Sequence, residues 1–145
     1  MDLRPSQVRQ RGLAEALQEL YQRWQAAQGI PVETAIVLAG RYLPSGVEDG
    51  IYRVAQESLS NVAKHAEAHA VFVSLVEGQR QITLSVTDDG HGFDSAHAVS
   101  GGHFGLVSMQ ERAHALGGTL VIERDTYQGT TVRLTVPLTW NEDGE

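Results

Sequence analysis

The sequence contains no cysteine, which excludes disulfides and thiolate metal sites. No apolar run approaches the ~18 residues that a membrane span needs, and the polar N-terminus lacks a signal-peptide core. Basic residues are few, because 11 Lys and Arg stand against 18 Asp and Glu, for a net charge of -7. This balance argues against nucleic-acid binding, which needs a basic footprint. We therefore expect a cytoplasmic domain without direct membrane contact, whose parent protein could still be membrane-anchored.

A chain of 145 residues with 41% hydrophobic residues fits one globular domain with its own core. Apolar residues at three- and four-residue spacing predict helices at residues 6–28, 47–66 and 106–116. Ser45 is a candidate cap for the second of these helices. Stretches rich in β-branched residues predict strands at residues 30–38, 70–76, 81–87, 119–124 and 130–138. Most strands follow one another directly, which predicts an α+β fold with helices on one face of a mixed, mostly antiparallel sheet.

The predicted helix at 47–66 carries a polar row beside its apolar face. Glu57, Asn61 and Lys64 are spaced by four and three residues, so they are neighbours on the helix surface. Such a row is typical of a solvated helix face. It also suits a Mg²⁺–phosphate site, because a carboxylate and an amide oxygen are hard ligands and a lysine neutralises phosphate oxygens. The spacing alone leaves both interpretations open.

A glycine-rich segment follows the predicted strand at 81–87. Asp88 comes directly after the strand, and Gly90 and Gly92 alternate behind it. Glycines let the backbone approach a ligand closely and adopt positive φ. The carboxylate is then free to accept a hydrogen bond from an exocyclic amine such as N6 of adenine. An ordinary Asp-Gly turn is the competing interpretation.

Two further glycine pairs precede regular elements. Gly102-His103-Phe104-Gly105-Leu106 leads into the predicted helix at 106–116, and a glycine-rich helix entry is a potential anion site. The dinucleotide and Walker patterns are both excluded, because their spacing and their Gly-Lys-Ser/Thr end do not occur. Gly129-Thr130 precedes the last strand and, by itself, indicates only a turn.

Taken in order, these four pieces resemble the motifs of the ATP-binding Bergerat fold, which histidine kinases share with type II topoisomerases, Hsp90 and mismatch-repair ATPases. Within that group the chain is most similar to sensor histidine kinases of the nitrate-sensor type. The similarity lies in Glu57-Ser-Leu-Ser-Asn61-Val-Ala-Lys64-His65-Ala, in His103-Phe-Gly105-Leu106 and in the Met109-Gln-Glu-Arg-Ala segment. It implies a two-layer α/β sandwich with about three helices on one face and an ATP lid.

The resemblance also implies domain limits. Residues 1–28 would be an N-terminal helix that remains from the linker after the phosphoacceptor helices. Residues 29–140 would be the catalytic ATP-binding domain, and residues 141–145 a polar tail.

The resemblance further implies a role for each site residue. Asp88 would hold the adenine amine with help from Thr130, and Asn61 would bind Mg²⁺ through ATP. Glu57, Lys64 and His65 would be catalytic: Glu57 as a base near the γ-phosphate that also reaches the metal through water, the other two near the phosphates. The remaining nucleotide-contacting residues would be Gly90, Gly92, Gly102, His103, Gly105 and Leu106.

None of the six histidines precedes an acidic residue, as the family's phosphoacceptor does. We therefore expect Mg²⁺-ATP as cofactor and a separate phosphoacceptor helical domain and response regulator as partners, without self-phosphorylation. A catalytically degenerate nucleotide-binding module that docks a partner, and an anti-sigma-type serine kinase, are the alternatives. A zinc site at His65 and His69, spaced i and i+4, is a minor third alternative.

Overall fold

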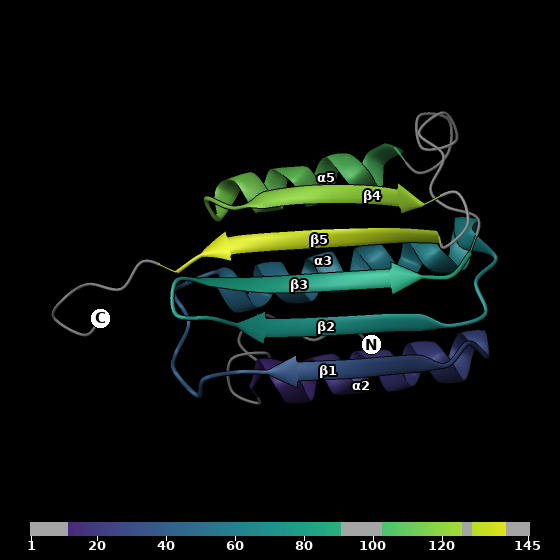
Figure 1. The fold of residues 1–145 in the computed structure, drawn as a ribbon, viewed down its shortest axis with the longest axis horizontal. Coiled ribbons are helices and arrows are strands. Elements are labelled where there is room, and N and C mark those ends of the chain that lie inside the picture. Colours follow the sequence, from purple (N-terminus) through teal and green to yellow (C-terminus); the bar gives the residue numbers. More distant parts are fainter. Residues whose placement is uncertain (1–11, 91–102, 126–128, 139–145) are drawn as a thin grey trace, which may run out of the picture.

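The computed structural model describes residues 12–90, 103–125 and 129–138. Their elements follow the predicted order of helix, strand, helix, two strands, helix and two strands (Figure 1). The bounds are α2 (Leu13–Gln28), β1 (Val32–Val37), α3 (Val47–Asn61), the π-helical turn η1 (Val62–Ala66), β2 (Val71–Glu77), β3 (Gln81–Asp88), α5 (His103–Ala115), β4 (Thr119–Asp125) and β5 (Gly129–Pro137).

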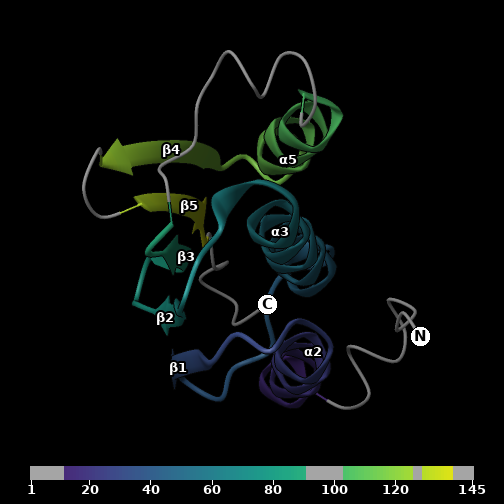
Figure 2. The same cartoon turned by 90° about the vertical axis from the view of Figure 1, so that its right-hand side faces the viewer.

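The five strands form one mixed sheet in the order β1-β2-β3-β5-β4. β1 pairs with β2 in parallel, and the other three pairs are antiparallel. The parallel pair needs a crossover, which α3 supplies, whereas the hairpins need only short turns. Figure 2 shows α2, α3 and α5 side by side on one face of the sheet. The expected two-layer α+β architecture is therefore confirmed.

Buried and exposed side chains alternate along the strands, which shows the face of the sheet that the helices cover. On β2 the residues Val71, Val73 and Leu75 are buried, while Phe72 and Val76 between them are exposed on the helix-free face. This is the period-2 pattern of a sheet that buries one side. The helices complete the core with Leu17 of α2 and with the α3 residues Ile51, Ala55 and Leu59. α3 is central, because it packs against α2, α5 and the strands β3 and β5.

Three local features differ from the sequence prediction or refine it. The N-cap of α3 is Gly46, with φ 86°, and no side chain caps the helix, so the expectation for Ser45 is wrong. A glycine satisfies this position because positive φ costs it little. The last helix begins at His103, three residues earlier than predicted. The end of the long central helix changes from α to π geometry at Val62 and stops at Glu67, whose φ is 51°.

Candidate functional site

Four chain segments meet at one end of the molecule. The C-terminal ends of α3 and β3 and the starts of α5 and β5 all lie at the right-hand side of Figure 1. Contacts between residues connect these segments. Asp88 of β3 is the cross-strand partner of Thr130 in β5, and the Asp89 side chain accepts hydrogen bonds from the segment that follows η1. The predicted site residues from four separate motifs are thereby brought to the same end of the sheet.

Asp88 is a buried carboxylate at the end of β3. It is only 5% exposed, and its partner Thr130 is 6% exposed. Asp88 Oδ1 accepts a hydrogen bond of 2.8 Å from the backbone N–H of Gly90. Burial raises the pKa of Asp88 above its usual value, while backbone hydrogen bonds from Gly90 and Thr130 oppose that rise and the neighbouring charge of Asp89 adds to it. The sheet thus holds an acceptor-rich group away from bulk water.

Gly129 makes room for this carboxylate. Its φ is 92°, and a Cβ placed on it would lie 2.0 Å from the backbone oxygen of Asp88 and 2.9 Å from Asp88 Oδ1. No side chain fits at either distance, and an L-residue also resists that φ. The first residue of β5 therefore has to be glycine, because Asp88 at the end of β3 lies so close to it. The sequence alone indicates only a turn at this position.

Asp89 joins the two sides of the site. Its Oδ1 accepts hydrogen bonds from the backbone N–H groups of His69, at 2.7 Å, and Ala70, at 3.0 Å. These bonds lower the pKa of Asp89, with the Ala70 bond as the larger cause. The carboxylate thus fastens the segment after η1 to the loop that follows β3. Asp89 is not among the site residues predicted from the sequence, because its partners lie 20 and 19 residues earlier in the chain.

The polar row on α3 is divided between two environments. Asn61 is 9% exposed and faces inward, whereas Lys64 is exposed and Glu57 is half-buried. Glu57 and Lys64 line a groove of about 350 Å³ between α3 and α5. The row is therefore more than a solvated face, since one member is buried and the other two flank a groove.

The π-helical turn η1 begins directly after Asn61 and contains Lys64 and His65. A π segment adds a residue to the helical turn, so it changes the direction in which the following side chains point. Such turns are frequent at functional sites. Here the change of geometry falls between the buried Asn61 and the exposed Lys64.

The start of α5 touches the middle of α3. A Cβ on Gly105 would lie 2.9 Å from Glu57 Oε2 and 3.1 Å from its Cδ, so the carboxylate rests against the glycine backbone. Leu106, the next residue, is half-buried beside the core. Deeper in the same contact, Ser58 Oγ lies 3.5 Å from Met109 Sδ. A side chain at position 105 would therefore have to displace the end of the Glu57 side chain.

Several predicted residues cannot be placed. Gly92 and Gly102 lie outside the described residues, and the side chains of His65 and His103 are likewise not described, although their backbones belong to η1 and α5. Among the residues that are described, no three His, Cys, Asp or Glu side chains gather as a metal cluster. In the same part of the chain, no helix is long and apolar enough to cross a membrane.

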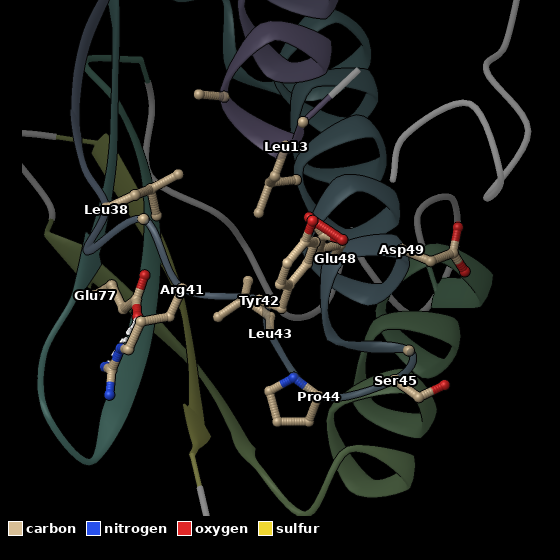
Figure 3. A pocket seen from close by; sticks show the side chains of 14 residues that line it. Leu13, Leu38, Arg41, Tyr42, Leu43, Pro44, Ser45, Glu48, Asp49 and Glu77 are labelled. Carbon is tan, nitrogen blue, oxygen red and sulfur yellow. Dashed lines mark hydrogen bonds and ion pairs between the residues drawn. The ribbon is translucent and has the colours of Figure 1, made fainter. Parts of the chain in front are cut away.

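A second hollow, of about 710 Å³, lies at the opposite end of the strands. Figure 3 shows it between the loop after β1 and the start of α3. Glu77, at the end of β2, accepts hydrogen bonds there from the backbone N–H of Ala39, at 2.9 Å, and from Arg41 Nε, at 3.0 Å. Glu48 and Asp49 add two more carboxylates to the lining. Carboxylates repel phosphate groups, so this hollow does not suit a nucleotide triphosphate.

Comparisons with known proteins agree with this geometry. Residues 46–139 match the family described as histidine kinase-, DNA gyrase B-, and HSP90-like ATPase, which is more than half of the chain. The chain belongs to this family. This confirms the prediction from the sequence that the chain is an ATP-binding domain of the sensor histidine kinase type. In such kinases this domain is the catalytic domain.

Three curated relatives of the chain are histidine kinases. The chain is 37% identical over 145 residues to the sensor histidine kinase LiaS of Bacillus subtilis, covering all of this chain and 39% of that protein. It is 36% identical to the histidine-protein kinase/phosphatase DegS of Brevibacillus brevis, covering 97% of this chain and 36% of DegS. The oxygen sensor histidine kinase NreB of Staphylococcus carnosus is 34% identical, with coverage of 96% and 40%. The chain thus spans less than half the length of each relative.

Solved structures confirm the fold. The blue-light activated histidine kinase of Erythrobacter litoralis superposes with a TM-score of 0.73 at 21% identity, over 87% of this chain and 42% of that one. The mycobacterial sensor histidine kinase MprB gives a TM-score of 0.66 at 20% identity, over 87% and 94%. At such identities the likeness concerns the arrangement of helices and strands alone.

Proposed function

We propose that this chain binds Mg²⁺-ATP and supplies the γ-phosphate for phosphorylation of a histidine on a helical phosphoacceptor domain in a two-component system. One observation carries the proposal: a buried carboxylate, Asp88, stands beside Thr130 at the end of the sheet, close to the end of the helix that bears Asn61 and Glu57. This arrangement offers an acceptor for a base at one side and groups for metal and phosphate at the other. The cognate response regulator would receive the phosphoryl group afterwards.

Recognition of adenine is assigned to Asp88 and Thr130. An ionised carboxylate accepts two hydrogen bonds per oxygen but donates none, so it favours the exocyclic amine of adenine over the carbonyl of guanine. Backbone hydrogen bonds from Gly90 and Thr130 use part of this acceptor capacity, and the rest remains for the ligand. Gly129 places no side chain beside the Asp88 carboxylate, which leaves space for a planar base to approach it.

The residues present also fit a magnesium ion held through the triphosphate. The amide oxygen of Asn61, a residue only 9% exposed, and the Glu57 carboxylate are the hard oxygen donors that Mg²⁺ prefers. Mg²⁺ would supply neutralisation of charge on the phosphate oxygens. Lys64 and His65 lie on the next helical turn, and we assign to them further contacts with the phosphates.

We assign to Glu57 the role of accepting the proton that the acceptor histidine loses. In the transfer, the bond between the γ-phosphorus and the bridging oxygen of ADP breaks, and a bond from the acceptor imidazole nitrogen to phosphorus forms. The imidazole N–H proton passes to Glu57 Oε2 or Oε1, and ADP leaves. Glu57 is half-buried and borders an open groove, so an acceptor side chain can reach it from outside while Gly105 backs its carboxylate.

The experiment has two stages. Isothermal titration calorimetry with ATP, ADP and GTP in the presence of Mg²⁺ should give binding for the adenine nucleotides and none comparable for GTP. Labelled ATP and a separately expressed phosphoacceptor domain should then yield acid-labile phosphate on that domain and none on this chain. Binding without transfer would favour the degenerate docking module, and acid-stable phosphoserine would favour the serine kinase.

A further inference from the structure

Three cationic side chains surround the groove between α3 and α5. Arg53 and Lys64 come from α3 and η1, and Arg112 comes from the last turns of α5. Among the lining residues that the structure describes, only Glu57 is acidic, so these residues carry a positive excess in a chain whose net charge is -7. Lys64 is the sole lysine of the sequence. Such a local reversal of sign attracts an anionic partner.

One carboxylate, that of Asp49, lies within ion-pair distance of both arginines. Asp49 Oδ1 lies 3.5 Å from Arg53 Nε, and Asp49 Oδ2 lies 3.8 Å from Arg112 Nη1. Arg53 Nη1 also donates to Gln56 Oε1 at 3.3 Å. Arg53 is 25% and Arg112 42% exposed at the side chain. Asp49 thus lies near two guanidinium groups from two different helices, and both of these groups keep part of their surface in solvent.

The shape of the groove selects between a small anion and a protein segment. From Arg53 to Lys64 the helix advances by roughly 16 Å, at 1.5 Å per residue. That length exceeds any phosphate group and corresponds to about three turns of a helix lying along the groove. Between the cations stand the short side chains Ser60 and Ser108, which leave room for a partner backbone. A guanidinium fork also matches a carboxylate in plane.

We propose that this cationic groove docks the acidic face of a phosphoacceptor helix, with carboxylates of that helix on Arg53 and Arg112 and its histidine brought to Glu57. This rests on the proposed function, and it names the surface by which the acceptor is recognised. The required partner chemistry is a helix with acidic residues on one face at i, i+4 and i+7 spacing. Arg53 and Arg112 are positioning residues and take no part in the transfer itself.

The test uses a ¹⁵N-labelled sample of the chain and two synthetic helical peptides. One peptide has a central histidine and glutamates at the stated spacing, and its twin has glutamine at each of those positions. The acidic peptide should shift the backbone amides of Ser60, Ser108 and Arg112, and the neutral twin should not. Affinity should fall roughly tenfold between about 0.05 and 0.3 M salt, because the contact is electrostatic.

The variant Arg112→Gln should weaken acidic-peptide binding about fivefold to tenfold, and Arg53→Gln together with Arg112→Gln should abolish it. Arg80→Gln removes the same charge on the exposed β2–β3 turn and should change nothing. ATP affinity should remain within about twofold in Arg112→Gln, whose preserved amide spectrum shows that it folds. If the double variant lost its dispersed spectrum, the single variant would carry the test.

Three results would overturn the inference. One is the absence of amide shifts in the groove at millimolar acidic peptide. Another is equal binding of the neutral twin peptide, which would mean that the groove does not recognise an acidic face. The third is a parallel loss of ATP affinity in Arg112→Gln, which would make it part of the nucleotide site. If the unmodified chain bound the acidic peptide but did not bind ATP, that result would contradict the proposed function and not the docking of the peptide.

Discussion

Replacing Asp88 by Asn tests the centre of the proposed site with a change of one atom. The side chain keeps its shape and can still accept the Gly90 N–H at Oδ1. Its second terminal atom becomes an NH₂ donor, however, and would face the donor amine of adenine. A hydrogen bond to a charged group contributes about 1.5–3 kcal/mol. ATP affinity should therefore fall by roughly 10- to 150-fold.

Folding stability should change in the opposite direction. Burial raises the pKa of Asp88, so the folded state binds its proton more tightly than the unfolded state does. The group's contribution to stability is then fully present below its ordinary pKa and is lost as pH rises through the folded-state pKa. At neutral pH the ionised carboxylate is thus a cost, which Asn removes. We expect Asp88→Asn to be at least as stable as the unmodified chain at pH 7, with the difference shrinking toward pH 4.

Two assays separate these effects. Titration calorimetry with Mg²⁺-ATP at pH 7 measures the affinity, and urea unfolding at several pH values measures the free energy of unfolding. Weaker binding together with equal or greater stability would show that the carboxylate serves the ligand and not the fold. An ATP affinity within about twofold of the unmodified chain would refute the adenine assignment.

Three further substitutions address the remaining parts of the site. Glu57→Gln should leave the calorimetric ATP affinity within about threefold but reduce transfer to the acceptor domain by roughly 10²-fold or more, since it removes the proton acceptor; retained transfer would exclude that role. Gly129→Ala should lower the free energy of unfolding by about 2 kcal/mol or more in urea unfolding, because φ at this position is 92° and an added Cβ would lie only 2.0 Å from the Asp88 backbone oxygen. A loss below ~0.5 kcal/mol would contradict this. Asp89→Ala should lower stability by about 1 kcal/mol at pH 7, an effect that disappears as pH falls through the lowered folded-state pKa of Asp89; a pH-independent loss would mean that its bonds to His69 and Ala70 are not the cause.

Local patterns were sufficient for the fold because each one repeats. The period-2 burial of β2 and the apolar stripe of α3 are visible in the letters alone. The same reasoning could place Glu57, Asn61 and Lys64 on one side of a helix, but it could not predict how deeply each side chain is buried. Depth depends on which neighbour covers the helix, and the π geometry at Val62 separates Asn61 from Lys64 in a way that an ideal helical projection does not reproduce.

The contacts that sequence reasoning missed are long-range. Asp89 bonds to His69 across 20 residues, and Arg41 pairs with Glu77 across 36. Both pairs exist only after the strands have found their register, and neither partner has a local pattern that distinguishes it from a surface charge. The Gly129 turn is similar, because its need for glycine comes from Asp88 in another strand.

The turn between β2 and β3 offers a place for a spectroscopic reporter. Gly78 N–H donates to the Gln81 carbonyl at 2.7 Å, which closes the turn, and Gln79 between them is exposed. The eight residues of β3 separate this turn from Asp88 by roughly 25 Å. Since the chain has no other thiol, Gln79→Cys would accept a single fluorophore. Energy transfer from that dye to a labelled nucleotide would then follow ATP arrival and ADP release in real time.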